Sequence, residues 1–339
     1  MNERIQELMN GLETAEAQRH GNLLVIPLRH RAPAGPAYIG LRQALAAKTL
    51  RIVEKDGGGS VPELVVVNKG ETGVLILDGE EVCGAKQNRV LNTTIMVKPG
   101  ESILVPVSCV EAGRWRSVSG CFEDSDQILS ASARTGKCER VTENLRHYGR
   151  YDGDQDAVWR DVGLLLEDAG ADSPTSAMSD AFLEQSDQLD TYQKAFPLLE
   201  GQAGLIVVSN GRVASLDVLS RPEVYADLHG KLVRSHAVEA RPRCGLGISL
   251  PDDQIDPEAL VSAFLDDARH GKEEVFPSRG AGHDHRLRGV DTAGSALVVD
   301  EAAVHLALFP RSNSRGEPKR PEPWNGLLID DRWEGYRLD

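Results

Sequence analysis

Short apolar runs separated by turn residues fill the first third of the chain. Pairs such as Lys69-Gly70 and Asp78-Gly79 stand between the runs and are typical of turns. Runs of this kind are typical of strands, so the pattern predicts an antiparallel sheet folded as a sandwich or a partial barrel. The apolar runs lie at residues 23–28, 50–53, 64–67, 74–77, 95–97 and 103–107.

After Phe122 the apolar positions change to a helical period. Pro174 breaks this part of the chain, and Asn210-Gly211 is a strong hairpin signal between two apolar runs. Helices are predicted at residues 4–16, 125–147, 154–169, 176–199, 222–240 and 257–270, and strands at residues 205–208, 213–216, 296–299 and 304–309.

These elements predict an α+β protein in three parts. An N-terminal antiparallel, β-rich core unit occupies residues 1–122. A helical and α/β portion, residues 123–310, packs on that core. The Pro-, Arg- and Glu-rich residues 311–339 form a tail. A chain of this length needs one large core or two interlocked ones.

The chain carries a net charge of −14, which is unevenly distributed. Residues 39–116 hold ten Lys and Arg against nine Asp and Glu, whereas residues 117–199 hold seven against sixteen. Because nucleic-acid binding needs a basic face, nucleic acid is not an expected partner. A small anionic ligand would be repelled least at the neutral N-terminal core.

The distribution of apolar residues and cysteines indicates a soluble, cytoplasmic protein without a membrane partner. No apolar run approaches the ~20 residues that cross a bilayer, and the charged N-terminus does not resemble a signal peptide. Five cysteines at scattered spacing, without a C-x-x-C pair, predict reduced thiols. The sequence assigns no cofactor and leaves open whether the protein forms a homo-oligomer.

One polar segment, residues 78–115, is where chemistry is expected. The common motifs of nucleotide-binding loops, zinc proteases and serine hydrolases are missing from the sequence. Two patches of the segment, residues 78–89 and 106–115, place polar side chains beside apolar strands, and these converge if the two strands are neighbours. The candidates are Glu80 or Glu81, Lys86, Gln87, Asn88, Arg89, Cys109, Glu111 and Arg114.

Such a set offers several kinds of chemistry. Glu81 and Glu111 are carboxylates for acid–base work, and Cys109 is a candidate thiol nucleophile. Lys86 and Arg89, with Arg114, are cations that suit a phosphate or a carboxylate group.

The same residues also have a structural explanation. Gln87 and Asn88 would then satisfy backbone groups in a loop, while Glu111 and Arg114 would form a buried ion pair. Cys109, with no histidine nearby in sequence, would be a small apolar core residue. The sequence leaves both explanations open.

A second candidate site is the sequence His283-Asp284-His285. On a strand the two imidazoles share a face, and His305 could complete a three-histidine zinc site. The Gly- and Ser-containing residues 278–282 favour an exposed loop instead, so no bound metal is expected.

The polar segment resembles the signature of a bacterial domain family. That family is named for its association with ADP-ribosylglycohydrolases and rhodanese-like phosphatases, and the resemblance extends to residues 305–309. It implies a setting of ADP-ribose or phosphate-ester chemistry. The motifs that carry it are Gly79-Glu80-Glu81, the run from Gly84 to Arg89 and the run from Val107 to Trp115.

The leading hypothesis is a small-molecule site that recognises a phosphorylated or ADP-ribose-like ligand, with hydrolysis as its candidate reaction. Lys86 and Arg89 would contact phosphate. Glu81 or Glu111 would orient a hydroxyl group or act as a base. A rival hypothesis is a non-catalytic interaction module whose acidic helices and tail contact a partner. A third is a metal-dependent hydrolase built on the histidine pair.

Overall fold

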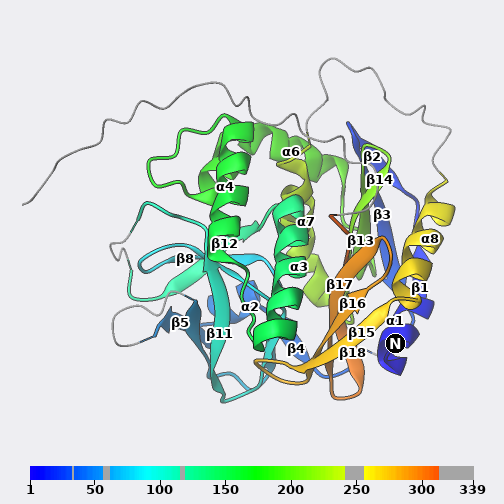
Figure 1. Ribbon diagram of the computed structural model, residues 1–339, viewed down its shortest axis with the longest axis horizontal. Coiled ribbons are helices and arrows are strands. Elements are labelled where there is room, and N and C mark those ends of the chain that lie inside the picture. The colour runs from blue at the N-terminus through cyan, green and yellow to red at the C-terminus, as the bar shows by residue number, and fades with distance from the viewer. Residues whose placement is uncertain (33, 56–61, 115–118, 241–255, 313–339) are drawn as a thin grey trace, which may run out of the picture.

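Helices lie between two β-structures in the molecule, as the computed structural model shows (Figure 1). The structure describes residues 1–312 apart from 33, 56–61, 115–118 and 241–255. The expected tail therefore lies outside the described residues from 313 onward. The combination of antiparallel sheets and helices confirms the α+β class.

The first β-structure is a partial barrel with a small sheet beside it. A six-stranded antiparallel sheet curls until its two edge strands contact each other, and the short helix α2 (Leu41–Ala46) packs on both edges. In order, its strands are β12 (Phe122–Ile128), β8 (Glu80–Gly84), β9 (Arg89–Leu91), β11 (Ser102–Cys109), β6 (Glu63–Asn68) and β5 (Leu50–Glu54). The small sheet consists of β10 (Ile95–Val97), β7 (Gly73–Ile76) and β4 (Tyr38–Gly40).

The second β-structure is a nine-stranded sheet that joins strands from both ends of the chain. Its β13–β14 hairpin turns at Asn210 and Gly211, both at positive φ, which confirms the hairpin prediction. Its strands are β1 (Leu12–Thr14), β3 (Leu23–His30), β13 (Gly204–Ser209), β14 (Arg212–Leu219), β18 (Ala302–Pro310), β17 (Thr292–Val299), β16 (His283–Arg288) and β15 (Lys272–Pro277), with β2 (Gln18–His20) paired to β3.

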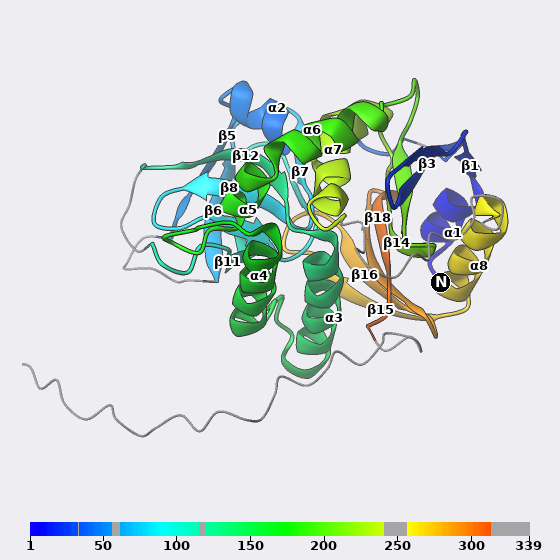
Figure 2. The same ribbon diagram turned by 90° about the horizontal axis from the view of Figure 1, so that it is seen from above.

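Helices cover both faces of this large sheet (Figure 2). Alternation along β3 explains why: Leu23 and Val25 join the central core, whereas Leu24 and Ile26 join the core on the other face. The helices between the sheet and the barrel are α3 (Ala131–Tyr148), α4 (Gln155–Ala169), α5 (Met178–Glu184), α6 (Ser186–Ala195) and α7 (Pro222–Ala237). On the opposite face lie α1 (Glu3–Asn10) and α8 (Pro257–Arg269).

Several element boundaries differ from the prediction. Residues 122–128 form the edge strand β12, so the helix predicted at 125–147 is wrong over residues 125–130 and begins at Ala131. The predicted helix at 176–199 is two helices that meet at Gln185. Residues 278–282 connect β15 to β16 as a loop, as expected, and His283 and His285 lie on strand β16. None of the helices in the described part of the chain is long and apolar enough to cross a bilayer.

Candidate functional site

The two polar patches lie side by side in the partial barrel. Strand β9 stands between β8 and β11, with Glu81 opposite Val90 and Cys109 opposite Arg89. The turn from residue 85 to 88 connects β8 to β9 and brings its amide side chains to the end of β11. The apolar run at 74–77 does not join them, because β7 belongs to the small sheet.

Glu111 and Arg114 form the ion pair at the centre of this cluster. The Arg114 guanidinium donates to both carboxylate oxygens, at 2.8 Å to Oε1 and 2.6 Å to Oε2. Thr175 and the backbone N–H of Asn88 donate to the same carboxylate. Burial tends to raise the pKa of Glu111, but these donors outweigh it and hold the pKa below its ordinary value. Glu111 is therefore an ionised carboxylate at neutral pH.

The turn residues are fixed by the same cluster. The Gln87 side chain donates to the Glu111 carbonyl at 2.8 Å, and Asn88 Oδ1 accepts from Arg114 at 3.0 Å. Arg114 also donates to the Ala85 carbonyl at 2.8 Å. Lys86, in contrast, is half-buried.

Arg89 lies deeper, on the barrel side of the sheet, and is 1% exposed. Its guanidinium donates to Gln87 Oε1 at 2.8 Å and lies 3.8 Å from Glu54. Its register partner Cys109 is also fully buried, and burial raises the pKa of the thiol to about 11. In this state the Cys109 thiol stays protonated at neutral pH.

Glu81 differs from the other carboxylates of the cluster. It is fully buried, Asn88 Nδ2 donates to its Oε1 at 3.2 Å, and its Oε2 has no hydrogen-bond partner among the described residues. Burial raises its pKa to about 7, although hydrogen bonds from the Ser125 and Asn88 side chains act to lower it, and the negative charges of Glu111 and Asp124 add to the rise. Glu81 therefore titrates near neutral pH.

A second buried polar network, which the sequence analysis missed, lies where α3 enters the space between the barrel and the large sheet. Arg134 of α3 donates to both carboxylate oxygens of Asp217, at 2.8 and 3.1 Å. His305 lies 3.4 Å from the same carboxylate, and its Nδ1 contacts Thr94 at 2.9 Å. Burial tends to raise the pKa of Asp217, but the positive charge and hydrogen bonds of Arg134 together outweigh this effect and hold the pKa far below its usual range.

Lys137, one turn further along α3, contacts the barrel, as Arg134 contacts the large sheet. Its ammonium group pairs with Asp78 and donates to the Leu91 carbonyl at 2.6 Å. Burial lowers the pKa of Lys137. The signal in the sequence was the i, i+3 spacing of Arg134 and Lys137 on a helix face that also carries the buried Cys138 and Val141.

The three histidines of the possible zinc site do not converge. His305 aligns with Asp284 across β17, so it faces the opposite side of the sheet from His283 and His285. His283 is exposed, and His285 is buried with its Nδ1 2.6 Å from Glu273. Within the described ranges, no group of three His, Cys, Asp or Glu side chains could hold a metal ion.

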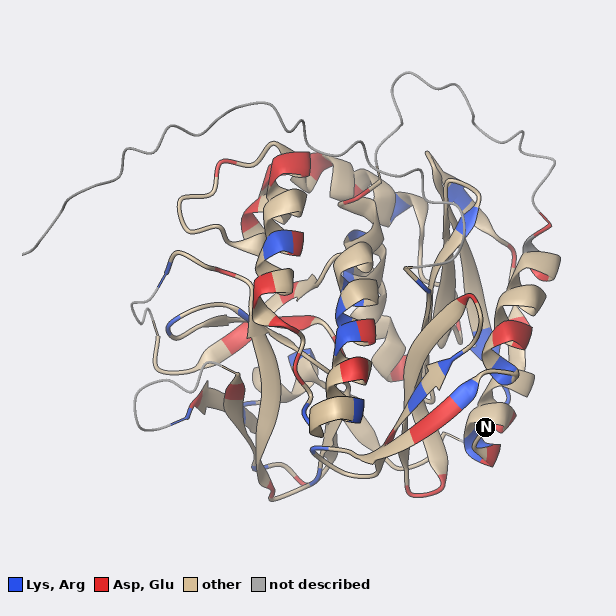
Figure 3. Cartoon of the chain, viewed as in Figure 1, with Lys and Arg blue, Asp and Glu red and all other residues tan. Residues whose placement is uncertain are grey.

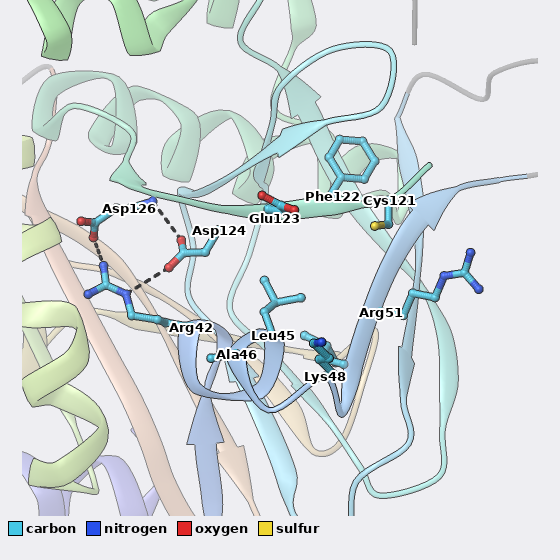
Figure 4. A pocket seen from close by; sticks show the side chains of 11 residues that line it. Arg42, Leu45, Ala46, Lys48, Arg51, Cys121, Phe122, Glu123, Asp124 and Asp126 are labelled. Atoms are coloured by element: carbon cyan, nitrogen blue, oxygen red, sulfur yellow. Dashed lines mark hydrogen bonds and ion pairs between the residues drawn. The ribbon is translucent and has the colours of Figure 1, made fainter. Parts of the chain in front are cut away.

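A groove of about 720 Å³ opens beside the cluster, between α2 and the edge strands β12 and β5 (Figure 4). Arg42 of α2 pairs with Asp124 at 3.2 Å and with Asp126. Asp124 also accepts from the buried Lys231 at 2.6 Å, and Lys231 in turn contacts Glu80 at 2.8 Å. Glu80 and Glu81, the first two residues of β8, thus have different partners: Glu80 pairs with Lys231, whereas Glu81 accepts from Asn88.

The model of the ARG and Rhodanese-Phosphatase-superfamily-associated Protein domain (ARPP-1) matches residues 11–309. The chain belongs to this family. The ARPP-1 match runs from just before β1 to the end of β18, so it contains the Glu81 cluster, the α3 network and the groove. No curated protein and no solved structure matches the chain. The family name links the chain to ADP-ribosylglycohydrolases and rhodanese-phosphatases by association.

Proposed function

We propose that the cluster around Glu81 is a small-molecule site that recognises a phosphorylated, ADP-ribose-like ligand. The observation that carries the proposal is the fully buried Glu81 carboxyl group, whose Oε2 has no hydrogen-bond partner among the described residues. Native structures pair nearly all buried polar atoms, so such an oxygen indicates a missing ligand or water. Its pKa of about 7 also suits proton transfer near neutral pH.

The turn before β9 supplies the groups that would recognise the ligand. Lys86 is a half-buried lysine of this turn, and its ammonium would contact the phosphate. Asn88 and Glu81 would bind the ribose hydroxyl groups. Glu111 and Arg114 act indirectly here, because their ion pair holds Asn88 and the Ala85 carbonyl in place. If the ligand is hydrolysed, the Glu81 carboxylate would take the proton of the attacking water.

The proposal gives Arg89 and Cys109 no direct contact with the ligand. The Arg89 guanidinium already donates to Gln87 at 2.8 Å and lies 3.8 Å from Glu54. A thiol with a pKa of about 11 is a poor nucleophile at neutral pH. The four cysteines in the described part of the chain are free thiols, which supports a reducing, cytoplasmic setting. The association in the family name supports the choice of ADP-ribose-like ligands.

The test is a thermal-shift titration with ADP-ribose, ADP and sugar phosphates. A ligand at 100 times its Kd stabilises the protein by about 2.7 kcal/mol, which a melting curve resolves. We expect Lys86→Ala and Glu81→Gln to remove the shift, whereas Lys69→Ala, at an exposed lysine outside the cluster, keeps it. No shift for the wild type with any of these ligands, or an unchanged shift in Lys86→Ala, contradicts the proposal.

A second candidate function, a non-catalytic interaction module, is supported by the surface of the central helices. Leu164 of α4 is 44% exposed and Leu183 of α5 is 73% exposed. Helices α4 and α6 carry acidic residues, which are red in Figure 3. Exposed leucines within an acidic surface suit a partner that presents apolar and basic side chains. A Leu164→Ser, Leu183→Ser variant that loses a partner captured by the wild type would support this function.

A further inference from the structure

The groove at the seam of the partial barrel is separate from the Glu81 cluster. Strands β12 and β5 are the two edges of the six-stranded sheet, and they approach each other without belonging to neighbouring positions in it. Helix α2 packs against both strands and forms one wall. The resulting volume of about 720 Å³ lies within the range of small-molecule sites.

One end of the groove has its charges paired. Arg42 lies between Asp124 and Asp126, as the dashed lines in Figure 4 show. The buried Lys231 forms a second ion pair with Asp124. Glu123 adds a further negative charge to this strand. A ligand that carried negative charge at this end would be repelled.

The other end carries two cations, Lys48 and Arg51. Both side chains are exposed, and neither forms an ion pair with any residue that the structure describes. Lys48 follows α2 at a φ of 58°, and its N–H donates to the Leu45 carbonyl at 2.9 Å, so its backbone is fixed at the rim. Between the two charged ends, Leu45 and Leu50 give the groove an apolar floor.

We propose that this groove binds a small amphipathic anion. Its single acidic group, a phosphate, sulfonate or carboxylate, contacts Lys48 and Arg51. Its apolar body lies over Leu45 and Leu50, and its uncharged end faces Glu123. Lys48 and Arg51 give this end of the groove a positive charge that attracts an acidic group, and the carboxylates at the far end select against a second one. This site does not depend on the proposed function of the Glu81 cluster.

The first test uses 8-anilinonaphthalene-1-sulfonate, an apolar anion whose fluorescence rises on binding. We expect saturable binding to the full chain and competition by phenyl phosphate, which carries one acidic group on an apolar body. The double variant Lys48→Asn, Arg51→Gln should weaken binding about tenfold or more, a change of about 1.4 kcal/mol. Asn tolerates the positive φ at position 48, so the variant keeps the fold.

The matched control removes two exposed cations outside the groove, with Lys69→Asn and Arg160→Gln. It should bind the dye as the wild type does, and so should Lys86→Ala, which separates this site from the Glu81 cluster. Equal affinity of the wild type and the Lys48, Arg51 double variant overturns the proposal. So does equal weakening in the control, because the binding would then follow net charge alone.

The second test locates the bound dye. Cys121 lines the groove, whereas Cys83, also half-buried, lies outside it. Saturating dye should slow the alkylation of Cys121 by iodoacetamide and leave the rate at Cys83 unchanged, as measured by peptide mass spectrometry. Protection of both thiols, or of neither, contradicts binding in the groove.

Discussion

At Arg89 a charged side chain occupies a place in the barrel that borders apolar core residues. It shares a face with Val82 and Leu91, which belong to that core, and its contacts go to Gln87 and Glu54. These contacts indicate that the Arg89 guanidinium stabilises the fold, whereas the sequence left open whether it does so or contacts a ligand.

We expect Arg89→Ala to lower the free energy of unfolding by roughly 3–5 kcal/mol, because it leaves buried polar partners unpaired. Lys86→Ala, three residues earlier, should change it by about 0–1 kcal/mol. Urea unfolding followed by circular dichroism measures both. If Arg89→Ala is as stable as Lys86→Ala and loses ligand binding, Arg89 contacts the ligand after all.

Glu81 gives the stability of the protein a pH dependence of defined sign. Its pKa is raised from 4.5 to about 7, so the folded state favours the neutral carboxyl group. Stability from this group is complete below pH 4.5 and falls as the pH rises to 7. As the pH rises from 4.5 to 7, the free energy of unfolding of Glu81→Gln should therefore increase relative to that of the wild type, by about 3 kcal/mol in total. A stability difference between the two proteins that is constant from pH 4.5 to 8 contradicts the raised pKa.

At the scale of elements, α3 joins the two β-structures through its buried cations. Lys137 contacts Asp78 beside the barrel, and Arg134 contacts Asp217 in the large sheet. All four side chains are buried, so removing either member of a pair leaves the charge of the other buried and unpaired.

We expect Lys137→Met to destabilise the protein by roughly 3–5 kcal/mol, since it leaves the Asp78 carboxylate buried and unpaired. Adding Asp78→Asn should recover a large part of that loss. Arg160→Met, on the exposed face of α4, serves as the control and should have little effect. Thermal and urea unfolding provide the measurement. A Lys137→Met protein as stable as this control would show that the pair contributes nothing to folding.

At the scale of the whole molecule, the N-terminal part depends on the rest of the chain. Strand β3 pairs with β13, which lies far later in the sequence. Asp78 and Glu80 form ion pairs with lysines on α3 and α7. The predicted division at residue 122 therefore separates partners that contact each other in the fold.

We expect a chain of residues 1–122 alone to remain unfolded, and the full chain to unfold in a single transition. The fragment would expose the sheet face of β3 and two buried carboxylates without partners. Circular dichroism of the fragment and calorimetry of the full chain test this. A cooperative melting curve from the fragment would show that the first 122 residues fold as an independent domain.

The local pattern of the sequence determined much of the fold by itself. The apolar runs at 50–53, 64–67 and 103–107 are strands because alternation and flanking turns are properties of neighbouring residues. The same holds for the Asn210-Gly211 hairpin and for α4. Strand β12 could not be predicted, because its interior is polar and its conformation depends on pairing with β8.

Only the tertiary structure decided which polar residues meet and how far each is buried. The sequence brought Glu81, Asn88, Glu111 and Arg114 into one segment, and the structure places them in contact. The sequence could not show that Glu81 is buried with one carboxyl oxygen lacking a hydrogen-bond partner among the described residues. Nor could it show that Arg134, Asp217 and His305 meet across long separations in the chain. Burial and charge partners are set by contacts between distant segments, and these contacts determine the pKa values on which the proposed function depends.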